Sequence, residues 1–573
     1  MIKKTALLRI IFCLPAFLPV MVVFLNLPAM IYFHNQHLVH HQISILVPYM
    51  IASAVAGGLL LAVLLRLPLA VKRSVILGFF SIGVFLGVSD MLYSWSFITI
   101  LKQWAPSDAA FSVFLERFKT IVPFIGFGIA VQIPRRIFHR FGIFFTLFLF
   151  PVFLGSAGYE VLSARQEYFP GAPRHEAGIP DSGRHNIYHL TFDAMGGPEF
   201  ERIVRENNTG DSFEGFTFFK NSLANYVSTT LSVASFMTGS LYRGESMKKW
   251  VEEEKQGGVI RSLYEKGYAV SMYAPFKTFR HSKAAKMMTH ADVIRPDEKL
   301  LMHWTFADWW LLRLTSFFPG VNVYNEDKGV FTRLFNHTDL TRENQLAVAA
   351  SVRLLDQLIM DEVSRPATGQ YVYAHIYIPH GPFVLDSNCE YHNPSTYKEQ
   401  NQCAVNLMKK FINRLKKLGR YNSSAILFQS DHGQWPGVPA VSMKMPEDVR
   451  EKIKSIQPAS GDCMLLDVLS RAFLAVKPPF AGNQPLATSD YSTQLADVPV
   501  ILNNLAGESS TAGRGEAFLL PLFSGDRSFP VYCGFAQGNK EFGRHRMEGE
   551  LYGFSYGPQK GWNVEPDIHV RWR

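Results

Sequence analysis

The sequence predicts a helical membrane region followed by an α/β domain whose mostly parallel sheet is covered by helices on both faces. Two patterns lead to this fold class. Long apolar runs with few charges fill the first 160 residues, and short strands alternate with amphipathic helices after residue 186. Charged residues make up only 18% of the chain, against about 25% in ordinary soluble domains. This composition excludes a disordered chain and disfavours a purely soluble one.

The formal net charge of +9 is unevenly distributed. Residues 1–160 hold 12 Lys and Arg but only 4 Asp and Glu, so the rest of the chain is nearly neutral. A nucleic-acid-binding protein clusters its basic residues on one face or along a helix. Here the basic excess lies beside apolar segments, and we therefore expect no nucleic-acid partner.

Five apolar segments are predicted to span a membrane within residues 1–162. No charged residue occurs between Arg9 and Arg66, and a polar break at residues 34–42 divides this stretch. Each half is long enough to cross about 30 Å of hydrocarbon at about 1.5 Å per residue. The remaining predicted spans are Ser74–Val88, Ile121–Ile133 and Phe141–Val161.

Basic residues in alternate loops predict the orientation of these spans. They precede the first span and separate the second from the third and the fourth from the fifth: Lys3, Lys4, Arg9, Arg66, Lys72, Arg73, Arg135, Arg136 and Arg140. The positive-inside rule then places the N-terminus in the cytoplasm and the chain after Val161 outside. Residues 163–185, rich in Pro and Gly, are predicted to be a linker, and residues 186–573 an external domain.

Two cysteines of the predicted external domain lie close together in the sequence. Cys389 and Cys403 could close a local loop, where a disulfide would be worth about 3 kcal/mol. Disulfides persist outside the cytoplasm. Free buried thiols are the alternative, and the sequence leaves both open.

The external domain is predicted to alternate strands with helices. Predicted strands are rich in β-branched and aromatic residues, at Asn186–Phe192, Tyr268–Tyr273, Tyr371–Ile378 and Ser424–Gln429. Predicted helices lie at Thr230–Met237, Val348–Glu362 and Val405–Leu418. Sheets of this kind place their sites beyond the carboxyl ends of the strands.

Polar side chains follow three of the predicted strands. The first strand is followed by Asp193, a later one by His380, and another by Asp431 and His432. Two carboxylates and an imidazole suit one divalent cation, with Zn²⁺ or Mn²⁺ favoured over Mg²⁺ or Ca²⁺. Each residue alone is also typical of a turn or a helix N-cap, but their recurrence at successive strand ends favours a metal site.

A cluster of hydroxyl residues between Tyr226 and Gly239 offers a nucleophile. The hydroxyls crowd the start of a predicted apolar helix, where Ser and Thr are also preferred as N-caps. A helix N-terminus favours anions such as phosphate. A Thr hydroxyl there becomes a nucleophile only when a base or metal activates it. Thr229 is the first candidate, and Thr230 is the alternative nucleophile or a substrate contact.

Four motifs in the same order resemble the sulfatase-like branch of the alkaline phosphatase superfamily. The first is an apolar strand that ends in an acid, here Asp193. The others are Thr229-x-x-Ser232-x-x-Ser235-x-x-Thr238-Gly239, Pro379-His380-Gly381-Pro382 and Ser430-Asp431-His432-Gly433. A late segment, Ala496 to Gly507, is also similar to the family, so that the resemblance covers roughly residues 186–510.

This resemblance implies an alkaline-phosphatase-like fold and assigns roles to matching residues. It implies one divalent metal held by Asp193, Thr229, Asp431 and His432. Thr229 would be the nucleophile and His380 would contact the transferred group. His375 is a further candidate for contacting the substrate, although its place in mid-strand is also typical of a core histidine.

Departures from the sulfatase pattern narrow the expected chemistry. In true sulfatases the nucleophile begins a Cys/Ser-x-Pro-x-Arg motif, whereas the matching segment of this chain is Thr229-Thr230-Leu231-Ser232-Val233. The modifiable residue, the Pro and the Arg are absent, which disfavours sulfate-ester hydrolysis. Ala194 also replaces the second acid of the usual sulfatase pair, which favours one firmly held metal.

The predicted spans and external domain together resemble lipid-headgroup transferases of bacterial envelopes. The resemblance implies a location in the bacterial cytoplasmic membrane, a membrane phospholipid as donor, and an envelope glycan or a lipid-linked molecule as acceptor. The transferred group would be phosphoethanolamine or phosphoglycerol. Two alternatives stay open: a membrane-anchored phosphatase, phosphodiesterase or sulfatase-like hydrolase that uses water, and a non-catalytic envelope assembly protein.

Overall fold

The computed structural model describes most of the predicted external domain and part of the apolar N-terminal region. The described residues are 12–35, 43–92, 184–242, 250, 257–275, 281–315, 329–336, 343–433, 449, 451, 466–507, 529–541, 544–557 and 561–572. The predicted fourth and fifth spans, and nearly all of the predicted linker, lie outside these residues. By compactness the chain forms two units, one holding residues 1–170, 295–343 and 540–545, and the other holding the remainder.

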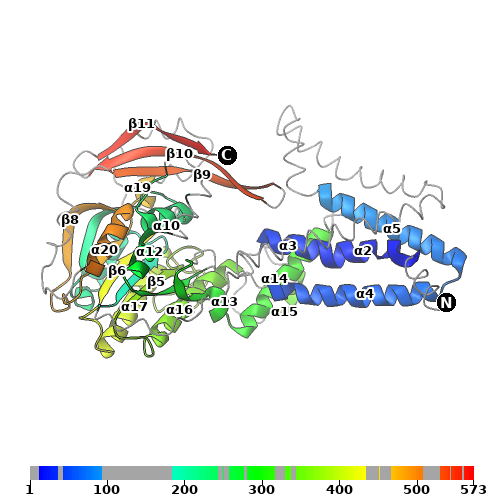
Figure 1. Cartoon of the computed structure of the whole chain (residues 1–573), viewed down its shortest axis with the longest axis horizontal. Coiled ribbons are helices and arrows are strands. Elements are labelled where there is room, and N and C mark those ends of the chain that lie inside the picture. The colour runs from blue at the N-terminus through cyan, green and yellow to red at the C-terminus, as the bar shows by residue number, and fades with distance from the viewer. Residues whose placement is uncertain are drawn as a thin grey trace. The chain divides into compact units, whose positions relative to one another are not determined.

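The first unit is helical. Its N-terminal elements are η1 (Leu14–Phe17), α2 (Leu18–Met21), η2 (Val22–Asn26), α3 (Leu27–Asn35), η3 (Ile43–Leu46), α4 (Val47–Arg66) and α5 (Leu69–Leu92) (Figure 1). Two stretches, Leu14–Tyr32 and Ser44–Arg66, are long and apolar enough to cross a membrane. They match the first two predicted spans, and α5 covers the third. Helices α14 (Pro296–Thr315) and α15 (Val330–Phe335) belong to this unit, although they come much later in the chain.

An eight-stranded sheet forms the centre of the second unit. Its strands are β1 (Ile187–Phe192), β2 (Thr217–Leu223), β3 (Ala269–Ala274), β4 (Ala284–Thr289), β5 (Gln370–Ile376), β6 (Ala425–Gln429), β7 (Leu474–Lys477) and β8 (Ala487–Gln494). They lie in the order β4-β3-β5-β1-β6-β7-β2-β8. All the pairings are parallel except those of β7 with β6 and β2. The predicted mostly parallel sheet is confirmed.

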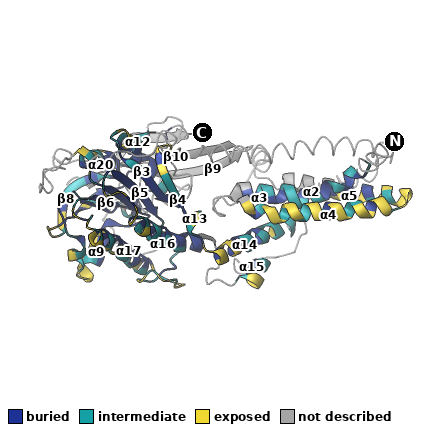
Figure 2. Cartoon of the chain, turned by 60° about the horizontal axis from the view of Figure 1, so that its bottom comes forward, coloured by how far each residue is buried: buried dark blue, intermediate teal, exposed yellow. Residues whose placement is uncertain are grey.

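Helices cover both faces of this sheet (Figures 1 and 2). One face packs against α9 (Gly197–Glu206), α16 (Glu343–Asp361) and α17 (Tyr397–Lys417), and the other against α10 (Thr229–Thr238), α12 (Gly258–Glu265) and α20 (Val498–Gly507). Strand β1 supplies both cores, because successive side chains point to opposite faces. Leu190 and Phe192 face the first set of helices and Ile187 the second.

Shorter elements complete the second unit. They are η4 (Gly210–Phe213), α13 (His290–Val293), α19 (Leu466–Leu469) and η7 (Leu495–Asp497). Strands β9 (Phe529–Glu541), β10 (Arg544–Gly557) and β11 (Gly561–Trp572) form a separate three-stranded sheet in the order β11-β10-β9.

The predicted strands and helices of the external domain are all present. The largest difference is at α17, which begins at Tyr397 rather than at Val405. Its first turns are polar, so apolar periodicity did not reveal them. The start is fixed instead by a capping box, in which Thr396 and Glu399 bond each other's backbone N–H groups.

Candidate active site

The predicted metal ligands lie together because their strands are neighbours. Asp193 directly follows β1, and Asp431 and His432 come just after β6. Since β1 and β6 pair in parallel, their carboxyl ends meet at one edge of the sheet. All three residues are buried, and one potential ligand atom from each lies within 4.8 Å of the others.

Hydrogen bonds orient both carboxylates and leave one oxygen of each toward the common centre. Asp431 Oδ1 accepts the N–H groups of Ala194 at 3.0 Å and His432 at 2.9 Å. Asp193 Oδ2 lies 3.2 Å from His375 Nε2. Asp193 Oδ1 and Asp431 Oδ2 are buried without a hydrogen-bond partner among the described residues. Buried oxygens of this kind are costly unless something binds them, and a divalent cation fits.

The imidazole of His432 completes this set. Its Nδ1 lies 3.0 Å from the carbonyl oxygen of Gly433, which makes Nδ1 the protonated nitrogen. Nε2 then carries the lone pair, and it lies 3.9 Å from Asp193 Oδ1 and 3.7 Å from Asp431 Oδ2. A second hydrogen bond that fixes the ring and its tautomer is typical of metal-binding histidines.

The glycine that ends the Ser430–Gly433 motif has a steric role. A Cβ at Gly433 would lie 2.3 Å from the carbonyl oxygen of Val468 and 2.7 Å from that of Arg471. Both neighbours are backbone atoms, which cannot move without shifting the chain. Only glycine lets the segment carrying Asp431 and His432 pass this close.

Ala194 adopts a left-handed conformation that serves the site. Its φ is 61°, which costs an L-residue with a Cβ about 1 kcal/mol or more. The turn directs the Ala194 N–H to Asp431, and its carbonyl oxygen accepts the buried Tyr397 hydroxyl at 2.9 Å. Strained residues held in this way are concentrated at functional sites.

The first turn of α10 is bound to the metal-ligand segment. Ser232 donates its hydroxyl to the carbonyl oxygen of Asp431. Thr229 is the first residue of α10 and is half-buried. Residues three apart share a face of a helix, so Thr229 lies on the face that contacts Asp431. Thr230 is exposed.

The predicted phosphate contact, His380, lies close enough to Asp193 to interact with its carboxylate. Its ring stacks on Tyr377 with centroids 4.3 Å apart, and its Nδ1 is 2.6 Å from the Gly381 carbonyl oxygen. Burial alone would raise the pKa of Asp193. The nearby charge of His380 and the hydrogen bond from His375 outweigh it, so that this pKa lies below its ordinary value. Asp193 is therefore ionised and ready to bind a cation.

His375 lies within the sheet, fully buried, between Asp193 and the Tyr373 hydroxyl. In this position it holds a carboxylate in place. Tyr377, which the motifs did not single out, is half-buried beside the site. Burial and the charges of Asp193 and Asp431 all raise the pKa of its phenol. The sequence feature that could have identified Tyr377 is its position three residues before His380.

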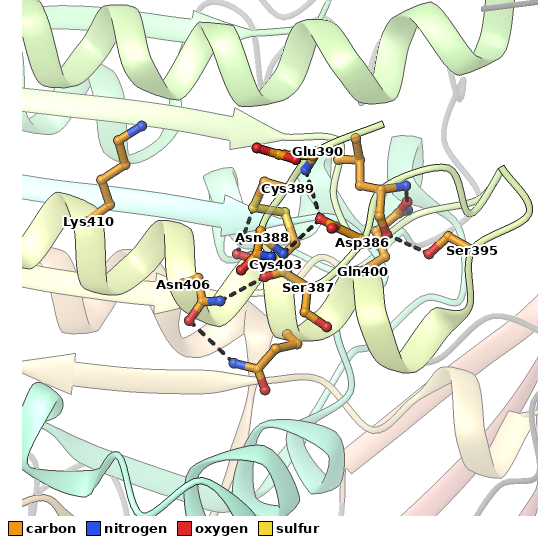
Figure 3. The surroundings of a disulfide bond; sticks show 12 residues. Asp386, Ser387, Asn388, Cys389, Glu390, Ser395, Gln400, Cys403, Asn406 and Lys410 are labelled. Atoms are coloured by element: carbon orange, nitrogen blue, oxygen red, sulfur yellow. Dashed lines mark hydrogen bonds between the residues drawn. A yellow bond between two sulfur atoms is a disulfide. The ribbon is translucent and has the colours of Figure 1, made fainter. Parts of the chain in front are cut away.

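The loop that carries His380 is fixed to α17. The buried Gln400 side chain donates to the His380 carbonyl oxygen at 2.7 Å and accepts the N–H groups of Val384 and Leu385. Further along, Cys389 and Cys403 form a disulfide that joins the loop to the same helix (Figure 3). Of the two alternatives for this pair, the disulfide is the one present.

Comparisons with known proteins agree with this geometry. The sequence model of the sulfatase family matches residues 193–448, which include every candidate metal ligand described above. Enzymes of this family are hydrolases or transferases that use a divalent metal. No curated protein matches the chain.

Several solved structures are similar to part of the chain. The phosphonate monoester hydrolase SpPMH from Silicibacter pomeroyi is 12% identical, with a TM-score of 0.39, over 66% of this chain and 90% of that one. An alkaline phosphatase superfamily protein from Vibrio parahaemolyticus is 9% identical, with a TM-score of 0.39, over 68% and 84%. The C-terminal periplasmic domain of the phosphoethanolamine transferase EptC from Campylobacter jejuni is 11% identical, with a TM-score of 0.35, over 60% and 96%.

The family match and the site geometry concern the same residues. Asp193, Asp431 and His432 meet at the carboxyl ends of two parallel strands, beside the helix that begins at Thr229. The part of the chain that matches the sulfatase family model, residues 193–448, is thus also the part that holds the candidate metal site.

Proposed function

We propose that the protein is a metal-dependent transferase that moves a phosphorylated headgroup from a membrane phospholipid to an envelope glycan through a phospho-threonine at Thr229. One observation carries the proposal. Two buried carboxylates and one imidazole each place one potential ligand atom within 4.8 Å of the others, and Ser232 bonds the adjoining backbone to the helix that begins at Thr229. This arrangement suits a hydroxyl nucleophile that attacks an anionic ester.

Asp193, Asp431 and His432 would hold the cation, with Thr229 as the fourth ligand. The orphaned oxygens of the two carboxylates supply the negative charge that such an ion needs. When bound, a divalent cation would lower the pKa of the Thr229 hydroxyl and neutralise charge on a phosphate oxygen.

The proposed reaction has two displacements at phosphorus. Thr229 Oγ1, which has lost its proton to solvent before the cycle, forms a bond to phosphorus, the bond from phosphorus to the diacylglycerol oxygen breaks, and that oxygen takes a proton. His380 is the proposed proton donor, because it lies near Asp193 and is half-exposed. An acceptor hydroxyl then attacks the phospho-threonine, loses its proton to the same histidine, and releases Thr229 with its Oγ1 deprotonated for the next cycle.

Phosphate is proposed over sulfate because of the nucleophile. In sulfatases the nucleophile is a Cys or Ser that is oxidised. This chain has Thr229 at the matching position, and Ser232 is bonded to the segment that carries the candidate metal ligands. An unmodified hydroxyl that forms a covalent ester is suited to phosphoryl transfer, which needs positioning and charge stabilisation above all.

A membrane phospholipid is the proposed donor because the chain carries apolar helices. Leu14–Tyr32 and Ser44–Arg66 are each long enough to span a bilayer. We propose five spans in all, with the N-terminus inside and the catalytic domain outside the bacterial cytoplasmic membrane. The Cys389–Cys403 disulfide supports an external location, because disulfides are rare in reducing compartments.

Intact mass spectrometry of the full chain tests this reaction. After incubation with phosphatidylethanolamine and phosphatidylglycerol, we expect an added mass of phosphoethanolamine or phosphoglycerol that maps to Thr229. Thr229→Ala should abolish the adduct and lower turnover by more than about a thousandfold. Thr238→Ala, at the other end of α10, is the matched control and should keep both.

The products of the same incubation separate the alternatives. A modified glycan supports the transferase, whereas free headgroup alone would identify a hydrolase that uses water. An adduct on Thr230 would identify Thr230 rather than Thr229 as the nucleophile. Unchanged chain mass and unchanged lipids, together with a normal cellular phenotype of Thr229→Ala, would favour an assembly protein.

A further inference from the structure

Helices α14 and α15 lie between β4 and β5 in the sequence, yet they belong to the compact unit of the N-terminal helices. The chain therefore leaves the catalytic domain after Ile294 and returns to it at Asn344. Sequence patterns gave no reason for this excursion. Its contacts and its exposed side chains indicate what it does.

Aromatic residues of α14 pack on both candidate spans. Trp310 lies 5.9 Å from Phe24 of the first span and 5.6 Å from Tyr49 of the second, measured between ring centroids. Phe306, one turn earlier in α14, lies 5.5 Å from the same Tyr49 ring. The C-terminal half of α14 is thus packed against two helices that are apolar enough to lie in lipid.

A polar contact joins α14 to the first span where that span departs from α-helical geometry. Residues Val22–Asn26 form a π-helical turn, and the Val23 carbonyl oxygen accepts the indole N–H of Trp310 at 2.9 Å. A carbonyl without a partner costs several kcal/mol in hydrocarbon. Trp310 satisfies this oxygen, which indicates that α14 accompanies the span inside the membrane.

Side-chain contacts join α14 and α15 into one hairpin. The buried Asp308 carboxylate of α14 accepts the N–H groups of Phe331 and Thr332 at 2.7 and 2.8 Å, at the start of α15. Gly329 permits this approach, because a Cβ there would lie 2.0 Å from Asp308 Cγ. The ring of Trp304 packs on Phe335 at 4.8 Å.

The outer surface of this hairpin is apolar. Its exposed large apolar side chains are Leu300 (44%), Leu312 (44%), Leu334 (65%) and Phe335 (42%). Residues of α4 such as Ile51 (59%) and Leu59 (65%) are exposed in the same way. In water each such side chain would cost about 1 kcal/mol or more relative to burial. Contact with lipid would account for the exposed apolar side chains of both the hairpin and α4.

We propose that the α14–α15 hairpin is embedded in the bilayer and that Leu300, Leu312, Leu334 and Phe335 bind phospholipid acyl chains. Phospholipid is chosen as the occupant because the hairpin continues the apolar surface of the spans it packs on. The inference rests on the membrane location in the proposed function. It adds that a segment inserted in the sequence between β4 and β5 of the catalytic domain lies in the lipid phase.

Site-specific photo-cross-linking in the full-length protein tests this proposal. The photo-cross-linker p-benzoylphenylalanine replaces Leu334 or Phe335, in nanodiscs of phosphatidylethanolamine and phosphatidylglycerol, and mass spectrometry identifies the adducts. Ile51, on a candidate span, is the positive control. Met360 and Val363 of the catalytic domain are matched negative controls, because they are 57% and 60% exposed.

We expect lipid adducts at positions 334 and 335 in a yield similar to that at position 51. At the control positions 360 and 363 we expect no lipid adducts. Lipid adducts at 51 but none at 334 and 335 would overturn the hairpin proposal alone. Adducts to a protein at 334 or 335 would overturn it in favour of a protein partner. No lipid adduct at 51 would overturn the membrane location itself. Repeating the series with Thr229→Ala separates lipid contact from phosphoryl transfer, because the adducts should persist.

Discussion

The two compact units place their apolar side chains in opposite ways. In the catalytic domain, Tyr188, Leu190 and Phe192 of the central strand are fully buried. Within the part of the chain that the structure describes, nineteen large apolar side chains are exposed, and fourteen of them lie in the helical unit that includes α14 and α15. The catalytic domain buries its apolar surface within itself, and the helical unit presents much of its own outward.

The proposed place of the helical unit in lipid accounts for this difference. Burial of apolar surface stabilises a domain in water, whereas lipid is as apolar as leucine and favours no such burial. Polar groups follow the opposite rule, because an unpaired polar group is tolerated in water but is costly in lipid. The catalytic domain can bury Asp193 and Asp431 because backbone N–H groups and histidines surround them. A helical unit in lipid would have to pair even a single carbonyl, as Trp310 does for Val23.

The largest expected effect concerns the buried charges of the catalytic domain. Asp431→Asn removes a ligand charge while keeping its shape, and we expect turnover to fall by about a thousandfold, because a bound cation supplies several kcal/mol of transition-state stabilisation. Metal content, measured by plasma mass spectrometry, should fall with it. A chelator should reproduce the loss in the unmodified protein, and added Zn²⁺ or Mn²⁺ should reverse it.

Asp356→Asn is the control for this change. Asp356 lies on the surface of α16, where it pairs with Lys410, and exposed pairs contribute about 1 kcal/mol or less. Its removal should leave both activity and metal content unchanged. Full activity of Asp431→Asn would contradict the metal site, and equal losses in both variants would point to general destabilisation.

The site was predictable where strand order alone decides the geometry. Asp193 and Asp431 follow strands that alternate with helices, and parallel neighbours bring such ends together. The sequence could not show that His375 meets Asp193, because that contact depends on the relative register of β1 and β5. Nor could it show the left-handed Ala194, whose strain is supported only by tertiary contacts.

Parts of the fold escaped prediction for physical reasons. Strand β8, with the sequence ATSDYSTQ, is largely polar and lies at the edge of the sheet, and β7 has only four residues. Neither has the apolar pattern that predicts a strand. Helix α14 carries Asp308 and Arg313 among its aromatics. Those charges hide its association with the N-terminal helices, which the ring contacts of Phe306 and Trp310 show.

The second prediction tests the contrast between the units directly. Leu59 of α4 and Val363 after α16 are almost equally exposed, at 65% and 60%. Leu59→Asp should cost about 3 kcal/mol of membrane insertion, because a charge near the middle of a span must leave water. Val363→Asp should change stability by no more than about 0.5 kcal/mol. The fraction of each variant that resists alkaline extraction from membranes provides the measurement. Equal behaviour of the two would remove the distinction between the units.

The smallest expected effect concerns one hydrogen bond of the helical unit. Trp310→Phe keeps an aromatic ring against Phe24 and Tyr49 but removes the N–H that Val23 accepts. We expect a loss of about 1 kcal/mol in the stability of this unit. The buried thiol of Cys13 reports it: its alkylation, followed on the peptide by mass spectrometry, should become several-fold faster.

Trp304→Phe is the matched control, on the same helix. The Trp304 indole N–H is buried and has no hydrogen-bond partner among the described residues, so its removal breaks no bond. The rate of Cys13 alkylation should therefore stay at its original value or fall, because an unsatisfied polar group is removed. If both variants accelerated alkylation equally, ring packing rather than the bond to Val23 would hold α14 against the first span. The proposed place of the hairpin in lipid would then rest on its apolar side chains alone.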